Sequence, residues 1–322
     1  MRKNGGQALK LKRPATERSR IAISRNWHPE TDATLYLGDC RALLRQMPDA
    51  SAQLVVTSPP YNIGKKYEKR IVLRDYLLRE KEVIDLCIDK LAIGGSICWQ
   101  VGNHVDKGEV FPLDILLYPF FKERGLSLRN RIVWHFEHGL HSSHRFSGRH
   151  ETILWFTKDD ADGNYLFNLD PVRVPQKYPG KKAYKGPKKG QHTSNPLGKN
   201  PGDVWIIPNV KHNHVEKTAH PCQFPVELVE RLVLALTRPG DLVVDPYMGA
   251  GSALAAAVMR GRRGAGAEVV AEYVKIAKQR VEEAGAGTLP VRPRTRPIYE
   301  PPANSPLTTN PWAGNASELF DE

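Results

Sequence analysis

Residues 242–252 read LVVDPYMGAGS, an apolar stretch that runs directly into a glycine-rich turn. Leu242–Val244 predicts a buried strand, and the alanine-rich stretch Ala253–Arg260 predicts the helix that follows it. Glycine lets the backbone turn tightly between the two elements and come close to a ligand, and the first turn of the helix offers free N–H groups. The turn is therefore a candidate ligand site at the end of a strand.

Outward from this turn, strands and helices alternate over most of the chain. The alternation predicts an α/β protein of Rossmann-like type, with a mostly parallel twisted sheet and helices on both faces. Ligands of such sheets bind outside the carboxyl ends of the strands. Strands are expected at Thr34–Leu37, Gln53–Thr57, Ser96–Val101, Arg131–Phe136, Thr152–Thr157 and Ala265–Glu268, and helical segments at Arg41–Gln46, Arg74–Leu91 (ended by Gly94-Gly95), Pro225–Leu236 and Ala271–Glu283.

The composition favours a polyanionic partner. The 322 residues include 47 Lys and Arg against 35 Asp and Glu, a net charge of +12. Basic side chains bind phosphates with release of counterions, although a merely basic soluble enzyme is the alternative. The four cysteines show no metal-binding spacing and suit reduced thiols. With no apolar run of membrane length and no signal-peptide core, we expect a cytoplasmic protein without a membrane partner.

Residues 158–219 interrupt the alternation with a segment rich in loops. Within it, residues 171–202 hold eight basic and no acidic residues. This pattern favours a nucleic-acid contact surface, with a solvated loop as the alternative. The candidate contacts are Arg173, Lys177, Lys181, Lys182, Lys185, Lys188 and Lys189. Residues 1–27, a basic arm, and 285–322, a proline-rich tail, are expected to be flexible.

The second candidate site is the pentapeptide Thr57-Ser58-Pro59-Pro60-Tyr61, which also follows an apolar strand. Two prolines remove two N–H donors, so the turn presents acceptors, the Ser58 hydroxyl and the Pro59 carbonyl. An exocyclic base amine needs two such acceptors, because its lone pair is otherwise conjugated into the ring. Tyr61 offers a flat face for stacking a base. Such a pentapeptide also occurs by chance in proline-rich loops.

An acidic residue strengthens the case for a nucleoside cofactor at the glycine turn. Glu268 ends the next expected strand, 17 residues after Gly251, where a carboxylate can bind a ribose diol. A dinucleotide enzyme is the alternative at this point. The third glycine of its fingerprint is missing, since position 254 is Leu.

The runs DPYMGAGSALAAA and GAEVVAEYVKIAKQRV resemble the S-adenosyl-L-methionine-binding segment of bacterial amino-methylating DNA methyltransferases, and the resemblance covers roughly residues 34–284. It implies that Gly249 and Gly251 lie under the methionine portion of the cofactor and that Glu268 holds the ribose hydroxyls. The segment HPCQFPVEL would pack along the methionine tail, with Phe224 where many members have Lys. Asp39 would accept from the adenine amine, or equally cap a helix. The full expected cofactor set is Asp39, Thr57, Phe224, Asp245, Pro246, Tyr247, Gly249, Gly251, Ser252 and Glu268.

The order of the motifs resembles the β class of this family, because the catalytic motif precedes the cofactor motif. The resemblance implies a catalytic half at 28–157, a target recognition region at 158–219 and a cofactor half at 220–284. Asn62–Lys66 would be a mobile loop beside the flipped base, with Lys65 and Lys66 contacting DNA. Trp134 and Arg149–Thr152 would finish the base pocket, or equally pack in the core.

The expected catalytic residues are therefore Ser58, Pro59, Pro60 and Tyr61, and the expected substrate is double-stranded DNA. Enzymes of this family that act on cytosine N4 often carry Ser at the first position, so cytosine N4 is favoured, with adenine N6 as the alternative. An RNA or protein-amide methyltransferase usually has the opposite motif order. A non-catalytic DNA-binding regulator would have lost Ser58, Pro59 or the glycines.

Four histidines between 135 and 144 invite a metal interpretation, but they lack a recognisable ligand set. We expect a phosphate-facing or irregular loop and no metal. A second copy of the chain, as a homodimer, and a cognate restriction endonuclease are further partners that the sequence leaves open.

Overall fold

The structure is a computed structural model that describes residues 21–64, 68–137, 139, 141–294, 296–298, 302, 305–306 and 308. The chain divides into two compact units, Met1–Val291 and Arg292–Glu322. All elements described below belong to the first unit. Among the described residues, no helix combines the length and apolar character needed to cross a membrane.

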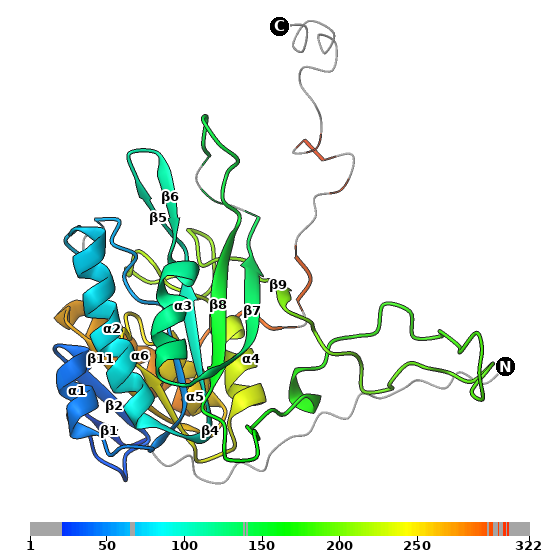
Figure 1. Ribbon diagram of the computed structural model, residues 1–322, viewed down its shortest axis with the longest axis horizontal. Coiled ribbons are helices and arrows are strands. Elements are labelled where there is room, and N and C mark those ends of the chain that lie inside the picture. The colour runs from blue at the N-terminus through cyan, green and yellow to red at the C-terminus, as the bar shows by residue number, and fades with distance from the viewer. Residues whose placement is uncertain are drawn as a thin grey trace, which may run out of the picture. The chain divides into compact units, whose positions relative to one another are not determined.

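A nine-stranded sheet organises the first unit, in the order β1-β2-β11-β10-β3-β4-β8-β7-β9 (Figure 1). Among these described strands, β8 alone runs antiparallel to its neighbours. The predicted mostly parallel α/β architecture is therefore confirmed. The strands are β1 Ile23–Ser24, β2 Ala33–Leu37, β3 Ala52–Thr57, β4 Leu91–Val101, β7 Ser127–His135, β8 His150–Thr157, β9 Val204–Ile206, β10 Leu242–Asp245 and β11 Arg263–Glu268.

Helices cover both faces of the sheet, as Figure 1 shows. Alternate residues of β3 belong to different cores: Leu54 and Val56 pack with α4, α5 and α6, whereas Val55 packs with α1, α2 and α3. This two-residue alternation is what a strand buried on both faces requires. The helices are α1 Cys40–Gln46, α2 Leu73–Lys90, α3 Leu113–Glu123, α4 Val226–Leu236, α5 Ser252–Met259 and α6 Ala271–Ala286.

The strand order reverses between β3 and β10, which lie side by side with Val244 opposite Val55. From β3 the sheet continues to β4 on one side, and from β10 it continues to β11 on the other. A crevice forms at the carboxyl ends of strands at such a switch point. Both motifs from the sequence, at residues 57–61 and 245–252, start at these two strand ends.

Several elements were not predicted. The hairpin β5 Asn103–Asp106 and β6 Glu109–Pro112 carries few apolar residues, and α3 contains Pro119 in its interior. Gly94-Gly95 was expected to end the helix before the next strand, but both glycines lie within β4. A methyl group on Gly95 would approach the backbone oxygens of Ala92 and Gln53 within 3.0 Å, so the strand needs glycine there.

Two boundaries of the expected flexible ends differ. Ile21, Ile23 and Trp27 pack against the core and β1 pairs with β2, so residues 21–27 are anchored to the folded unit and do not form part of an arm. At the other end α6 continues to Ala286, and Leu289 and Val291 also pack on the core. Residues 1–20 lie outside the described part of the chain.

The segment 158–219 contains little regular structure, namely the 3-10 turn η1 Asp170–Val172 and strand β9. Val174 and Lys199 exchange two backbone hydrogen bonds of 3.0 and 2.8 Å and so close the base of a long excursion. Beyond that base, two isolated bridges pair Lys182 with His192 and Ala183 with Lys189. The excursion projects away from the sheet beyond β9 (Figure 1).

Candidate functional site

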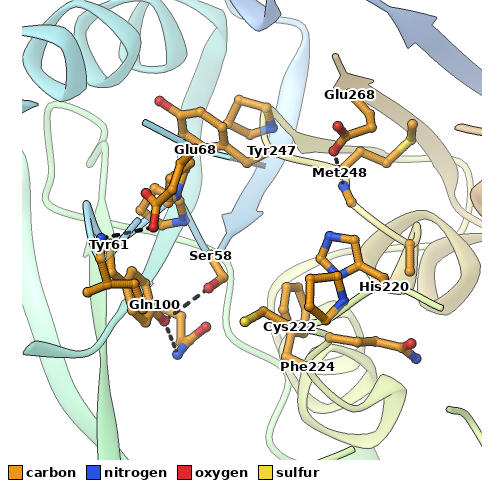
Figure 2. Close-up of a pocket in the computed structure, with 18 of the residues that line it drawn as sticks. Ser58, Tyr61, Glu68, Gln100, His220, Cys222, Phe224, Tyr247, Met248 and Glu268 are labelled. Atoms are coloured by element: carbon orange, nitrogen blue, oxygen red, sulfur yellow. Dashed lines mark hydrogen bonds between the residues drawn. The ribbon is translucent and has the colours of Figure 1, made fainter. Parts of the chain in front are cut away.

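A cavity of about 1110 Å³ lies at the carboxyl ends of β3, β4, β10 and β11. Single-ligand pockets occupy about 300–1,000 Å³, so this space is large enough for two reactants. Figure 2 shows side chains that face it from two sides, Ser58 and Tyr61 on one and Met248, His220 and Glu268 on the other. Of the expected site residues, the lining includes Asp39, Ser58, Pro59, Pro60, Tyr61, Phe224, Pro246, Tyr247, Gly249, Ser252 and Glu268.

Behind the cavity wall, a buried hydrogen bond joins the two strand ends. Thr57 Oγ1 donates to Asp245 Oδ1 at 2.6 Å, and both residues are fully buried. The backbone N–H of Tyr247 donates to the same carboxylate oxygen at 3.1 Å. Burial raises the pKa of Asp245 to about 7. Thr57 and Asp245 do not line the cavity, so the structure gives them a supporting position where cofactor contact was expected.

The glycine turn has two residues in the left-handed region, Gly249 with φ 50° and Gly251 with φ 72°. A Cβ on Gly251 would lie 2.8 Å from the Cβ of Ala277, so this glycine allows α5 to approach α6. Gly251 does not line the cavity. Gly249 does, and its N–H donates to Glu268 Oε2 at 3.1 Å.

Glu268 lies on the cavity wall at the end of β11. Its Oε1 accepts from the N–H of Val270 at 2.8 Å, so two backbone bonds fix the carboxylate in place. Burial raises its pKa, although these N–H groups act in the opposite direction. The sequence-based expectation of a carboxylate at this strand end is thus met by a rigid acceptor.

Asp39 lines the same end of the cavity and caps α1, accepting from the N–H of Arg41 at 2.8 Å. The Arg41 guanidinium also binds this carboxylate, and holds the pKa of Asp39 below its usual value. The helix-cap alternative is therefore correct for this residue. The contact with an adenine amine stays a prediction.

One buried acid of the cavity wall was missed by the sequence analysis. Glu80 of α2 accepts from the Tyr247 hydroxyl at 2.8 Å, and burial raises the pKa of Glu80 to about 8. It occupies the apolar face of α2, four residues after the buried Tyr76 and four before the buried Ile84. That helical spacing was the available signal.

On the opposite side, Ser58 and Tyr61 belong to a hydrogen-bonded network. Tyr61 OH lies 3.0 Å from Ser58 Oγ and accepts from Gln100 Nε2 at 2.7 Å (Figure 2). Tyr61 OH also donates to Glu151 Oε2 at 3.1 Å. Gln100 also donates to Glu151. Burial raises the pKa of Glu151 to about 7. Gln100 was missed by the sequence analysis, whereas Glu151 falls in a segment expected to finish the pocket.

The network determines whether the Ser58 hydroxyl donates or accepts its hydrogen bond with Tyr61. A tyrosine hydroxyl carries a single proton. Because Tyr61 donates that proton to Glu151, Ser58 donates to the Tyr61 oxygen in this arrangement. The lone pairs of Ser58 Oγ are then left for a donor in the cavity. Tyr76 OH donates to the carbonyl of Pro60 at 2.8 Å and fixes the turn.

The loop that follows was expected to be mobile, but its first residue is anchored. Asn62 is buried, and its side chain exchanges two hydrogen bonds of 2.8 Å with the backbone of Ile71. The Glu68 carboxylate accepts from the N–H groups of Asn62 and Ile63. Lys65 and Lys66 lie outside the described residues.

Trp134 is buried and lines the cavity, and its indole N–H donates to the carbonyl of Ile207 at 2.8 Å. It therefore serves both the core and the pocket. Among the described residues, no group of three or more His, Cys, Asp and Glu could hold a metal ion. Of the four clustered histidines, His138 lies outside the described part.

The basic residues of the long excursion fall into two groups. Arg173 is mostly buried, pairs with Asp170 at 2.7 Å and donates to the carbonyl of Gly198, so it stabilises the segment itself. None of the residues between 158 and 200, all of which are described, lines the cavity. The exposed group consists of Lys177, Lys181, Lys182, Lys185, Lys188 and Lys189.

A family model described as DNA methylase matches residues 52–279. The type II methyltransferase M.BglII of Bacillus subtilis is 52% identical over 246 residues, 76% of this chain and 68% of that protein. The DNA adenine methyltransferase YhdJ of Escherichia coli K12 is 32% identical over 258 residues, 78% of this chain and 83% of that protein.

Two solved structures share the fold. The PvuII DNA methyltransferase (cytosine-N4-specific) superposes with a TM-score of 0.63 at 23% identity, covering 84% of this chain and 94% of that one. A protein of Thermus thermophilus that is described as a DNA modification methylase, solved with S-adenosyl-L-methionine, gives a TM-score of 0.57 at 30% identity. The match covers 79% of this chain and 94% of that one.

Proposed function

This chain belongs to the family of DNA methylases, which methylate exocyclic amines of DNA bases with S-adenosyl-L-methionine, and on that premise we propose that its target is N4 of cytosine. The observation that carries the proposal is the Ser58 hydroxyl, an uncharged acceptor on the cavity wall at the first position of the catalytic motif. Adenine N6 is the alternative, and the relative named as an adenine methyltransferase favours it.

The residues of the cavity fit the cofactor. Glu268 offers a fixed carboxylate for two ribose hydroxyls, Gly249 brings backbone close to the cavity, and Phe224 contributes an apolar surface. The cofactor supplies an electrophilic methyl group on a sulfonium. We assign its nucleoside to the side of Asp39 and Glu268 and its methionine portion to the side of Gly249 and Phe224.

The target amine would lie against Ser58 and Pro59. Its two N–H groups would donate to Ser58 Oγ and to the Pro59 carbonyl, which frees the nitrogen lone pair from the ring. Holding the amine in this way lowers the barrier to displacement through alignment and charge placement. A base must leave the duplex to reach such a pocket, and Tyr61 and Trp134 offer aromatic surface there.

The methylated amine must lose one proton, and the network provides a route for it. The amine gives its proton to Ser58 Oγ, the Ser58 hydroxyl proton passes to the Tyr61 oxygen, and the Tyr61 proton passes to Glu151 Oε2. The first step exchanges an N–H bond for an O–H bond, and each of the next two exchanges one O–H bond for another. A carboxylate whose pKa is raised to about 7 is matched to accept a proton near neutral pH.

DNA would be contacted by the long excursion at 176–197, whose six exposed lysines are its main charges. Target recognition by the region 158–219 stays a prediction, as does a homodimer. A cognate restriction endonuclease also stays a prediction, favoured by a relative named as a type II methyltransferase.

Replacing Ser58 by alanine removes one of the two acceptors for the amine. We expect Ser58→Ala to lower the methylation rate by roughly 100-fold or more, the cost of losing one preorganised polar group, with cofactor affinity unchanged. Ser51→Ala is the control, because Ser51 immediately precedes the first residue of β3, at the end of the strand away from the cavity. The measurement combines calorimetric binding of S-adenosyl-L-methionine with nucleoside mass spectrometry of methylated duplex DNA.

In that measurement, the wild-type product is expected to be N4-methylcytosine. N6-methyladenine would overturn the choice of base but retain amine methylation. Full activity of Ser58→Ala would contradict the role of the acceptor pair.

The pH dependence of the rate tests the proton route. Since Glu151 accepts a proton only when ionised, the single-turnover rate should rise with pH and level off above about 7. Glu151→Gln cannot accept the proton, so its rate should be lower and lack this rise. Glu82→Gln is the control and should keep the wild-type profile, because Glu82 is a half-buried acid outside the cavity lining whose pKa is lowered by Arg41. An unchanged profile in Glu151→Gln would refute the route.

Removing residues 176–197 should leave the fold intact, because the hydrogen-bonded pair Val174 and Lys199 can be joined by a short turn. We expect weaker binding to duplex DNA and a shallower salt dependence, by about 0.9 in log–log slope for each lost phosphate contact. A variant with all six lysines changed to Gln isolates the charge. If both variants bound duplex DNA with the wild-type affinity and the wild-type salt dependence, this surface would be excluded as a DNA contact.

A further inference from the structure

The connection between β7 and β8, residues 136–149, extends from the wall of the cavity. The two strands stay paired to their ends, with Trp134 opposite Glu151 and His135 opposite His150. Phe136 N–H then donates to the carbonyl of Arg149 at 2.9 Å, so the ribbon continues past the sheet. Trp134, Phe136, Gly139 and Glu151 all line the cavity. Figure 1 shows the ribbon rising beyond the strand ends.

At the tip of this ribbon an aromatic ring points into water. The N–H of Ser142 donates to Ser147 Oγ at 3.0 Å, which closes a turn around Ser143, His144, Arg145 and Phe146. Phe146 is 100% exposed, the highest value among the exposed large apolar side chains of the described residues. A phenyl ring left wholly in water gains nothing for the folded chain, so its contribution is expected in a complex.

The charge around the ring indicates what covers it. Residues 136–149 hold Arg145 and Arg149 with three histidines, against the single acid Glu137. His144 and Arg145, next to the ring, are exposed. A protein partner would meet a tip with one apolar residue among basic ones. Duplex DNA offers phosphates for the basic side chains and a base stack for the ring.

We propose that Phe146 enters the base stack of the DNA and fills the gap that the target base leaves when it turns into the cavity. This inference rests on the proposed function. Phe146 and Glu151 are five positions apart, a span of at most about 17 Å, so the ring and the cavity reach neighbouring positions of one DNA site. Architectural DNA-binding proteins show that a phenylalanine ring can enter between base steps.

Filling the gap stabilises the open duplex, because a base stacks on an aromatic ring whatever its sequence. Phe146 therefore acts as a positioning residue for the extruded base rather than as a contact that only adds affinity. The two roles differ in one respect. A residue that assists extrusion is needed less when the target base is already unpaired, since extrusion then costs less.

The experiment compares Phe146→Ala, Phe146→Trp and Tyr184→Ala on two DNA duplexes. Tyr184 is 90% exposed on the long excursion and is the matched aromatic control. One duplex carries the target base, as identified for the wild type, in its normal pair, and the other carries it in a mismatch. Single-turnover methylation rates at saturating DNA are measured, with thermal unfolding to show that each variant is folded.

We expect Phe146→Ala to be about tenfold slower than wild type on the paired duplex and close to wild type on the mismatched one. Phe146→Trp should keep the wild-type rate on the paired duplex. Tyr184→Ala should match the wild-type rate on each duplex at saturating DNA. An undiminished rate of Phe146→Ala on paired DNA would overturn the proposal. An equal loss on both duplexes would overturn it too. A wild-type protein that methylates neither duplex would instead refute the proposed function.

Discussion

The hydrogen bond from Thr57 to Asp245 is the interaction on which the site depends. It joins residues 188 positions apart at the ends of β3 and β10, where the strand order of the sheet reverses. The catalytic motif starts at the next residue on one strand, and the cofactor motif starts at Asp245 on the other. Because each motif is a short turn held at its strand end, this contact and the pairing of β3 with β10 together hold the two sides of the cavity in place. Its burial explains why neither residue needs to touch a ligand.

The buried carboxyls around the cavity show how the fold prepares for its reactants. Asp245, Glu80 and Glu151 all have raised pKa values because burial disfavours their charged forms. A cation on the cofactor side of the cavity, such as a sulfonium, would favour the charged forms of Asp245 and Glu80 and lower their pKa values again. On the base side the same burial turns the chain of Ser58, Tyr61 and Glu151 into a set of oriented hydroxyls and a proton acceptor. The buried acids thus belong to two separate hydrogen-bonded groups, one with Asp245, Tyr247 and Glu80 and one with Ser58, Tyr61 and Glu151.

The sequence predicted what is local and missed what depends on distant partners. The apolar runs at 53–57 and 242–244 identified two central strands, and the turns that follow them identified both sides of the cavity. Glu80 could not be recognised as a wall residue, because its position depends on Tyr247, 167 residues away. Gln100 was hidden in an apolar strand, and its meaning appears only beside Tyr61 and Glu151. Arg173 looked like a DNA contact by composition, whereas its pairing with Asp170 and Gly198 stabilises the segment. The hairpin β5–β6 has no clear alternation of apolar and polar residues, so its strands could not be predicted from the sequence.

The most direct test of this account is to remove the link between the strand ends without changing its shape. Thr57→Val loses the hydroxyl and leaves the buried Asp245 carboxyl with the Tyr247 N–H but without its side-chain donor, a cost of about 1–3 kcal/mol, while Thr57→Ser keeps the bond. The measurement is the affinity for S-adenosyl-L-methionine together with the methylation rate of duplex DNA for both variants. We predict that Thr57→Val remains folded and that the product of its cofactor affinity and its methylation rate falls about tenfold or more. Thr57→Ser should resemble wild type in both quantities. A folded Thr57→Val variant with wild-type affinity and rate would contradict it.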